Sequence, residues 1–89
     1  MVRRRSIFIG HVQGVGFRYT AQDVARGFDV TGYVRNLPDG RVELVAEGER
    51  EQVGQFLGAL GQRMDGFIKR RLDDDAPPTG EFSDFSVRR

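Results

Sequence analysis

Residues 6–18 read Ser6-Ile7-Phe8-Ile9-Gly10-His11-Val12-Gln13-Gly14-Val15-Gly16-Phe17-Arg18, and this run changes from an extended segment to a helix. Residues 6–9 are rich in β-branched and aromatic side chains and apolar on both faces, which predicts a central strand of a sheet. The glycines that follow can adopt positive φ, so they favour a tight loop after the strand. A helical pattern of apolar residues then begins at Phe17.

Two segments repeat apolar residues with the period of an α-helix. The first helix is predicted to end near Gly27, and its apolar face carries Phe17, Ala21, Val24, Ala25 and Phe28. The second extends from about residue 49 to residue 64, and its apolar face carries Val53, Phe56, Leu57, Leu60 and Met64. This second helix also contains Gly54, Gly58 and Gly61, each of which costs roughly 1 kcal/mol against alanine. We therefore expect packing to stabilise it.

Four more segments are predicted as strands, at residues 30–36, 41–46, 67–72 and 82–87. Pro38-Asp39-Gly40 is a turn signal, so the first two of these form a hairpin. Within the second, Val42, Leu44 and Ala46 alternate with polar or exposed positions. The element order β-α-β-β-α-β with a terminal strand predicts an α+β, ferredoxin-like split βαβ sandwich. In this fold, two helices cover one face of an antiparallel sheet.

Length and composition restrict the function classes. The chain has 89 residues, no cysteine and one histidine, which predicts a single domain at residues 1–89. A thiolate nucleophile and a Cys/His zinc site are excluded. No apolar stretch approaches the roughly 18 residues of a membrane span. We therefore expect a cytoplasmic protein that does not bind a membrane.

Charge is balanced overall but clustered locally. The net charge of +1 gives no general attraction to nucleic acid or anionic lipid. Residues 3–5, 69–71 and 88–89 are basic clusters, and Asp73-Asp74-Asp75 is an acidic run beside a Pro/Gly-rich segment. We interpret these clusters as solvated strand ends and a flexible loop. The acidic run is a poor metal site because nothing nearby fixes its geometry.

The glycine-rich loop has the residue types of an oxyanion site. Gly14 and Gly16 let backbone N–H groups gather around a ligand, and the following helix adds the positive end of its dipole. Arg18 supplies a planar guanidinium that can bind two oxygens of a phosphate or carboxylate. Taken singly, the glycine pair could also make only a tight turn, and Arg18 could be a surface residue of the helix.

Two motifs together resemble the acylphosphatase family. Its signature loop reads Gly-x-Val-Gln-Gly-Val-Gly-Phe-Arg, and residues 10–18 match it with His11 at the variable position. Its other hallmark ends the second strand with an asparagine, as in Gly32-Tyr33-Val34-Arg35-Asn36-Leu37-Pro38-Asp39-Gly40. Residues 80–87 are similar to the last strand of the family. Two motifs at this separation are far more specific than either alone.

The resemblance implies hydrolysis of the carboxyl-phosphate bond of a small acyl phosphate to a carboxylate and inorganic phosphate. It implies that the phosphoryl oxygens are bound by the backbone N–H groups of Gly14, Val15, Gly16, Phe17 and Arg18. Arg18 would stabilise the transition state, and Asn36 would orient the attacking water. The chain lacks a cysteine, a Ser–His pair and a carboxylate dyad near the loop, which agrees with water as the nucleophile. The family uses no metal or other cofactor, and we also expect a monomer that binds no nucleic acid.

Several residues carry a second interpretation. An amide such as that of Asn36 can hold water because it accepts and donates hydrogen bonds without titrating. Asn36 could also be only a turn former before Leu37 and Pro38. His11 is interpreted as structural or solvent-facing because it has no evident partner. The aromatic residues predicted in the core are Phe17, Tyr33, Phe82 and Phe85.

Other functions share parts of this pattern. An RNA-recognition module has the same element order, and residues 7–12 look like its first-strand motif. Residues 41–47, however, carry no aromatic side chain on which a base could stack. A non-catalytic phosphate-sensing or carrier domain could use the same loop. A further alternative is a fragment similar to the acylphosphatase domain of a hydrogenase-maturation carbamoyltransferase.

Overall fold

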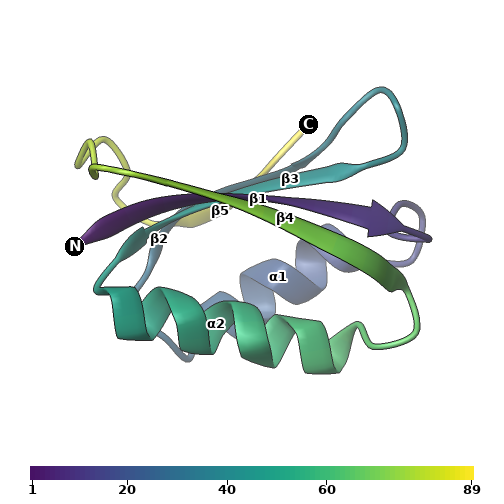
Figure 1. The fold of residues 1–89 in the computed structure, drawn as a ribbon, viewed down its shortest axis with the longest axis horizontal. Coiled ribbons are helices and arrows are strands. Elements are labelled where there is room, and N and C mark those ends of the chain that lie inside the picture. The colour runs from purple at the N-terminus through teal and green to yellow at the C-terminus, as the bar shows by residue number, and fades with distance from the viewer.

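The computed structural model describes all residues, 1–89, as two helices packed against a five-stranded sheet (Figure 1). In chain order the elements are β1 (Val2–Gly10), α1 (Phe17–Ala25), β2 (Thr31–Asn36), β3 (Val42–Gly48), α2 (Arg50–Arg63), β4 (Ile68–Ala76) and β5 (Phe85–Arg88). This is the predicted order of elements, and the α+β ferredoxin-like fold class is confirmed. β1 and β4 are longer than predicted, and α1 ends at Ala25 instead of near Gly27.

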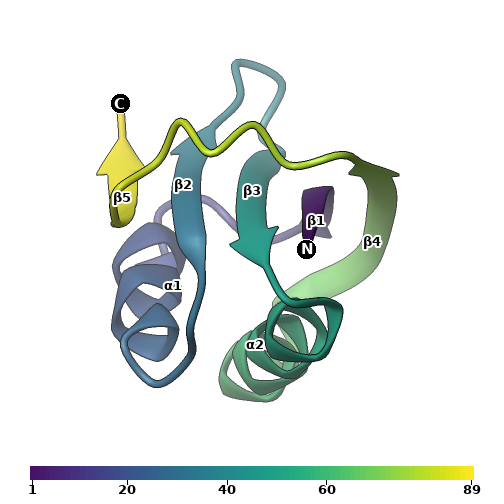
Figure 2. The same ribbon diagram turned by 90° about the vertical axis from the view of Figure 1, so that its left-hand side faces the viewer.

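The strands lie in the order β4-β1-β3-β2-β5. β3 is antiparallel to β1 and β2, and β4 is antiparallel to β1. β5 is parallel to β2, so the prediction of a purely antiparallel sheet is wrong at this edge. The segment after β4 crosses one end of the sheet (Figure 2). β5 therefore starts at the end where β2 also starts, and both strands run in the same direction.

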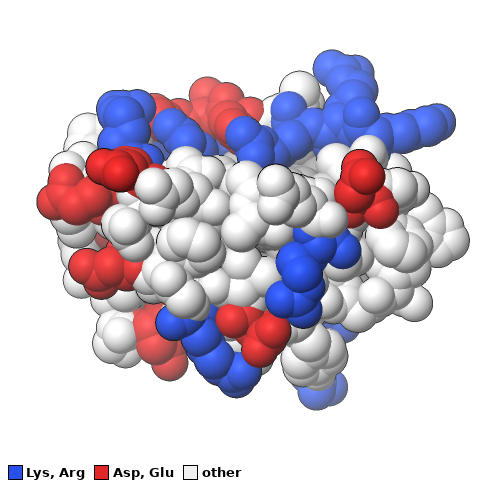
Figure 3. All heavy atoms as spheres, turned by 90° about the horizontal axis from the view of Figure 1, so that it is seen from below, with Lys and Arg blue, Asp and Glu red and all other residues white.

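Both helices cover one face of the sheet, and the main core lies between the two layers. The predicted apolar face of α1 is confirmed, with Phe17, Ala21, Val24 and Ala25 buried and Phe28 partly buried. The predicted face of α2 is also confirmed, with Val53, Phe56, Leu57, Leu60 and Met64 buried. The outer face of the helix layer mixes acidic and basic side chains around a largely uncharged centre (Figure 3).

The acidic run lies inside β4, although a flexible loop was predicted there. The register with β1 places Arg4 opposite Asp75 and Ser6 opposite Asp73. Arg4 donates to the Asp75 carboxylate from Nε at 2.7 Å and from Nη2 at 2.9 Å. Ser6 Oγ donates to Asp73 Oδ1 at 2.7 Å. The acidic run is ordered because opposite charges on the neighbouring strands β1 and β4 stabilise each other. The prediction was wrong because neither strand indicates from its own sequence which strand it pairs with.

β3 is buried on both faces, so the predicted alternation with exposed positions is wrong. Glu43 is only 3% exposed on the face away from the helices. It accepts hydrogen bonds from Arg5 Nε and Arg35 Nε, each at 2.6 Å, and from the Tyr33 hydroxyl at 3.0 Å. Burial by itself raises the pKa of Glu43, but these three hydrogen bonds outweigh it and lower that pKa. Glu47 is buried on the same face and accepts from Thr79 N–H and Gly80 N–H.

The predicted core aromatics divide between the two faces of the sheet. Phe17 and Phe85 are confirmed in the core between the helices and the sheet. Tyr33 is buried as predicted, but on the opposite face, where the Arg88 guanidinium lies 3.9 Å from its ring centroid. Phe82 is only half-buried and packs against Tyr33, with 5.8 Å between the ring centroids. The core prediction for Phe82 is wrong because that residue lies in the segment before β5, where it covers the open face.

Candidate active site

The loop between β1 and α1 depends on two glycines with left-handed backbone. Gly14 has φ 77°, and Gly16 has φ 78° at the position that caps the N-terminus of α1. A Cβ at either position would meet nothing within 4 Å. Backbone conformation, and not crowding, therefore requires glycine at both positions.

The same loop presents backbone N–H groups that the fold does not use. Among the backbone hydrogen bonds outside the helices and strands, none has a donor between Val12 and Tyr19. The first donor in this region is Thr20 N–H, which binds the Gly16 carbonyl at 3.0 Å. The N–H groups before it include the first turn of α1, where no preceding helical carbonyl is available. Together with the helix dipole, they form a place where an anion can bind.

Gln13 joins this loop to the hairpin between β2 and β3. Its Nε2 donates to the Leu37 carbonyl at 2.8 Å and to the Arg41 carbonyl at 2.9 Å. The loop and the end of β2 are thereby held in a fixed relation. The sequence places Gln13 within the signature loop but indicates no role for it, because a glutamine in a loop does not show which carbonyl groups it will reach.

Arg18 and Asn36 come together in a hollow of about 110 Å³. Arg18 lies in the first turn of α1, and Asn36 is the last residue of β2. The residues that line the hollow are Val12, Gly14, Gly16, Phe17, Arg18, Tyr19 and Asn36. Two motifs that are separate in the sequence thus meet at one site.

The hollow has a positive character. None of its lining residues is acidic, and Arg18 is its only charged side chain. Arg18 Nη1 donates to the Arg88 carbonyl at 3.3 Å, which ties the guanidinium to β5. That contact is long and uses one of five guanidinium protons, so the others stay available to an anion.

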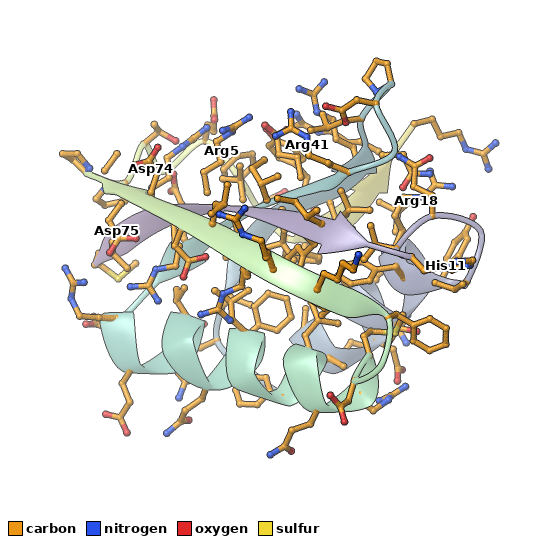
Figure 4. The ribbon with its side chains drawn as sticks, turned by 45° about the vertical axis from the view of Figure 1, so that its right-hand side comes forward. Arg5, His11, Arg18, Arg41, Asp74 and Asp75 are labelled. Atoms are coloured by element: carbon orange, nitrogen blue, oxygen red, sulfur yellow. The ribbon has the colours of Figure 1, made fainter.

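Other residues of the signature loop lie elsewhere. Val15 does not line the hollow and is partly buried against the core. His11 is exposed, and its ring centroid lies 6.2 Å from that of Phe67. Figure 4 shows His11 and Arg18 at the same end of the molecule. Val12 and Tyr19 were not predicted as site residues, yet both line the hollow.

Two further observations concern metals and membranes. The chain contains no group of three or more His, Asp or Glu side chains placed to hold a metal ion. Neither helix is long and apolar enough to cross a bilayer.

Comparison with known proteins gives consistent matches over the whole chain. Residues 4–87 match the model of the acylphosphatase family. The acylphosphatase of Acaryochloris marina is 41% identical over 85 residues, which cover 96% of this chain and 91% of that protein. The crystal structure of acylphosphatase from Bacillus subtilis has a TM-score of 0.91 and 32% identity, covering 100% of both chains. T. kodakarensis HypF matches with a TM-score of 0.85 and 31% identity, covering 100% of this chain and 12% of that one.

The sheet, its two helices and the match to enzymes over the whole chain define a small ferredoxin-like hydrolase. More particularly, the chain belongs to the acylphosphatase family. It is an enzyme whose family acts on small acyl phosphates.

Proposed function

We propose that this chain hydrolyses the carboxyl-phosphate bond of a small acyl phosphate in the hollow between α1 and β2. The observation that carries the proposal is the meeting of Arg18 and Asn36 with Gly14 and Gly16 around one hollow. An arginine and an amide side chain at the N-terminus of a helix can bind a phosphoryl group and a water molecule side by side.

The phosphoryl group is bound by the loop. The backbone N–H groups from Gly14 to Arg18 donate to its oxygens, and the Arg18 guanidinium neutralises the charge that spreads over them in the transition state. Val15 and Phe17 contribute only their N–H groups, because the Val15 side chain packs towards the core and that of Phe17 is buried in it. No other charged side chain lines the hollow, so this role falls to Arg18.

Asn36 orients the water that attacks phosphorus. As the water oxygen bonds to phosphorus, the bond from phosphorus to the carboxyl oxygen breaks, and the carboxylate leaves with the electron pair. One proton of the attacking water stays on its oxygen, which becomes a hydroxyl of the phosphate product, and the other passes to a second oxygen of that phosphate. An acyl phosphate has a good leaving group, so positioning and charge neutralisation can supply most of the catalysis. We propose that the enzyme needs no metal or other cofactor and that one chain supplies all residues of each active site.

An RNA-recognition function has no support on the sheet. The open face of β3 carries Glu43, Val45 and Glu47, all of them buried, and no aromatic residue. The nearest aromatic on that face, Tyr33, is covered by Arg88. No platform for base stacking is present.

The proposal is tested by exchanging the two side chains separately. Arg18→Ala should lose both phosphate affinity and turnover, with a fall in kcat of about a thousandfold. Arg18→Lys should recover little of this activity, because an ammonium group does not reproduce the planar contact of a guanidinium with two phosphoryl oxygens. Asn36→Ala should retain phosphate binding while turnover collapses, since the lost interaction belongs to the transition state.

Arg26→Ala is a matched control, because Arg26 is an exposed arginine just after α1 whose salt bridge is to Asp23. It should keep wild-type kinetics, and all variants should keep the wild-type circular dichroism. Benzoyl phosphate hydrolysis should be unchanged in EDTA. Near-normal turnover in folded Asn36→Ala, or intact phosphate binding in Arg18→Ala, contradicts the assigned roles.

A further inference from the structure

The free edge of β4 carries a charge pattern that is complementary to itself when read backwards. β4 is the last strand at one side of the sheet, so only its inner edge pairs, with β1 (Figure 2). Its residues 69–75 read Lys69-Arg70-Arg71-Leu72-Asp73-Asp74-Asp75. Three basic residues precede a leucine, and three acidic residues follow it.

We propose that two copies of this chain pair through β4 as antiparallel strands related by a two-fold axis at Leu72. In that register Arg70 faces Asp74 of the second copy, and Leu72 faces Leu72 of the second copy. The other two charged positions follow the same rule, with Lys69 opposite Asp75 and Arg71 opposite Asp73. Every opposed charged pair is attractive, whereas in-register parallel strands would oppose like charges, which is destabilising.

Arg70 and Asp74, which lie two positions from the axis on either side, are free to make these contacts. Arg70, Leu72 and Asp74 pair in register with Ile9, Ile7 and Arg5, so they share the open face of the sheet. Arg70 and Asp74 take part in none of the salt bridges within the chain. Leu72 between them is 44% exposed. A second copy would therefore cover Leu72 and pair two charges that have no partner in the single chain.

Three of the other four charged residues are already engaged inside each chain. Asp75 binds Arg4 and Arg50, and Arg71 binds Asp73 at 3.1 Å. In Figure 4, Asp74 and Asp75 lie at the same end of β4 and on opposite sides of the strand. Asp74 is thus the acidic residue that contributes most to the association, and Arg70 is its counterpart.

The predicted association is weak and sensitive to salt. Pairing through one strand edge gives a small interface, and exposed ion pairs contribute little and are screened by ions. Charged residues on an edge strand ordinarily prevent pairing with other strands. Here they disfavour the neighbouring antiparallel registers, in which Arg71 or Asp73 would face its own copy. The proposed dimer differs from the monomer that we expected from the sequence, and the oligomeric state decides between them.

The active site stays open in the dimer. β4 and β5 are at opposite edges of the sheet, and Arg18 contacts Arg88 in β5. Charge changes in β4 should therefore leave kcat unchanged, which separates this proposal from the proposed catalytic function.

Sedimentation equilibrium up to millimolar protein at low ionic strength tests the pairing. The wild-type chain should show a monomer–dimer equilibrium that weakens with salt. Arg70→Asp and Asp74→Arg should each weaken self-association about tenfold or more, because each change opposes two pairs of like charges. An equimolar mixture of these two variants should restore association, since every opposed pair then becomes attractive again. Arg89→Asp is the matched control and should associate like the wild type.

A cross-link locates the axis independently. The chain has no cysteine, so Leu72→Cys introduces a single thiol that lies opposite its own copy. Opposed residues of antiparallel strands have Cα atoms about 4.5 to 5.5 Å apart, within the range of a disulfide. Lys69→Cys is the control, because its two thiols would lie six positions apart, or about 20 Å. A wild-type chain that is monomeric throughout, a mixture that does not associate, or equal oxidation of both cysteine variants overturns the proposal.

Discussion

Removing the side-chain amide of Gln13 should damage both the stability and the activity of this enzyme. Gln13 Nε2 makes two hydrogen bonds, at 2.8 and 2.9 Å, to carbonyls at either side of the β2–β3 turn. Each such bond contributes about 0.5 to 1.5 kcal/mol net. Because Gln13 is half-buried, water can solvate part of the two carbonyl oxygens that lose their donor in Gln13→Ala, which limits the loss of stability. We expect Gln13→Ala to cost about 1 to 2 kcal/mol and to lower Tm by about 5 to 15 °C.

Activity should fall as well, because Gln13 sets the distance between the glycine loop and the end of β2. A misplacement of about 1 Å can cost on the order of a hundredfold in rate. We expect kcat/KM for benzoyl phosphate to fall about tenfold to a hundredfold in Gln13→Ala. Gln13→Glu should be worse at neutral pH, because a carboxylate of the same shape would face two carbonyl oxygens without a proton to donate.

Thermal unfolding and steady-state kinetics of both variants test this reasoning. Gln62→Ala is the control, because Gln62 is exposed on α2 and is remote in sequence from the loop and the hairpin. A Gln13→Ala protein with wild-type Tm and wild-type kcat/KM would refute the role of Gln13, because the loop would then be held by other contacts.

Three further predictions follow from the site, the β1–β4 pair and α2. Inorganic phosphate at about 100 times its Kd should inhibit competitively and stabilise the fold by roughly 2.7 kcal/mol; the Tm shift should vanish in Arg18→Ala. The hydrogen bond from Arg4 lowers the pKa of Asp75 from 3.8 to about 2. The ionised Asp75 carboxylate therefore stabilises the fold fully at pH values above its pKa in the unfolded chain. This stabilisation is lost as the pH falls through the lower pKa of Asp75 in the folded chain. Asp75→Asn should lower Tm at neutral pH and make progressively less difference in acid; a constant difference across that pH range contradicts the linkage. Gly58→Ala should raise stability by about 0.5 to 1 kcal/mol, because a Cβ at Gly58 meets nothing within 4 Å; Gly48→Ala should destabilise, since its Cβ would lie 2.7 Å from the Asp29 carbonyl oxygen. Equal Tm changes in the two alanine variants would contradict this distinction.

The helices were predictable because their signal is local. The apolar residues of α2 recur with the helical period, so one segment indicates which of its faces is buried. Burial of Phe56 and Leu60 follows from that spacing alone. The glycine loop was also predictable, because Gly14 and Gly16 supply the positive φ that the turn before α1 requires.

The partners of the charged residues were not predictable in the same way. Arg4 and Asp75 are far apart in the chain, and only the antiparallel register of β1 and β4 places them opposite each other. Glu43 was expected at an exposed or polar position of an alternating strand. It is buried because two arginines and a tyrosine from neighbouring strands cover it.

The sequence by itself determined the order of elements, the apolar faces of both helices and the two motifs that contain Arg18 and Asn36. The tertiary structure alone decided that these two side chains line one hollow, that Gln13 holds the loop to the hairpin, and that β5 is parallel to β2. The physical reason is the range of the interactions. Helical periodicity and glycine backbone preferences act within a few residues, whereas strand register and side-chain contacts join segments that are distant in the chain.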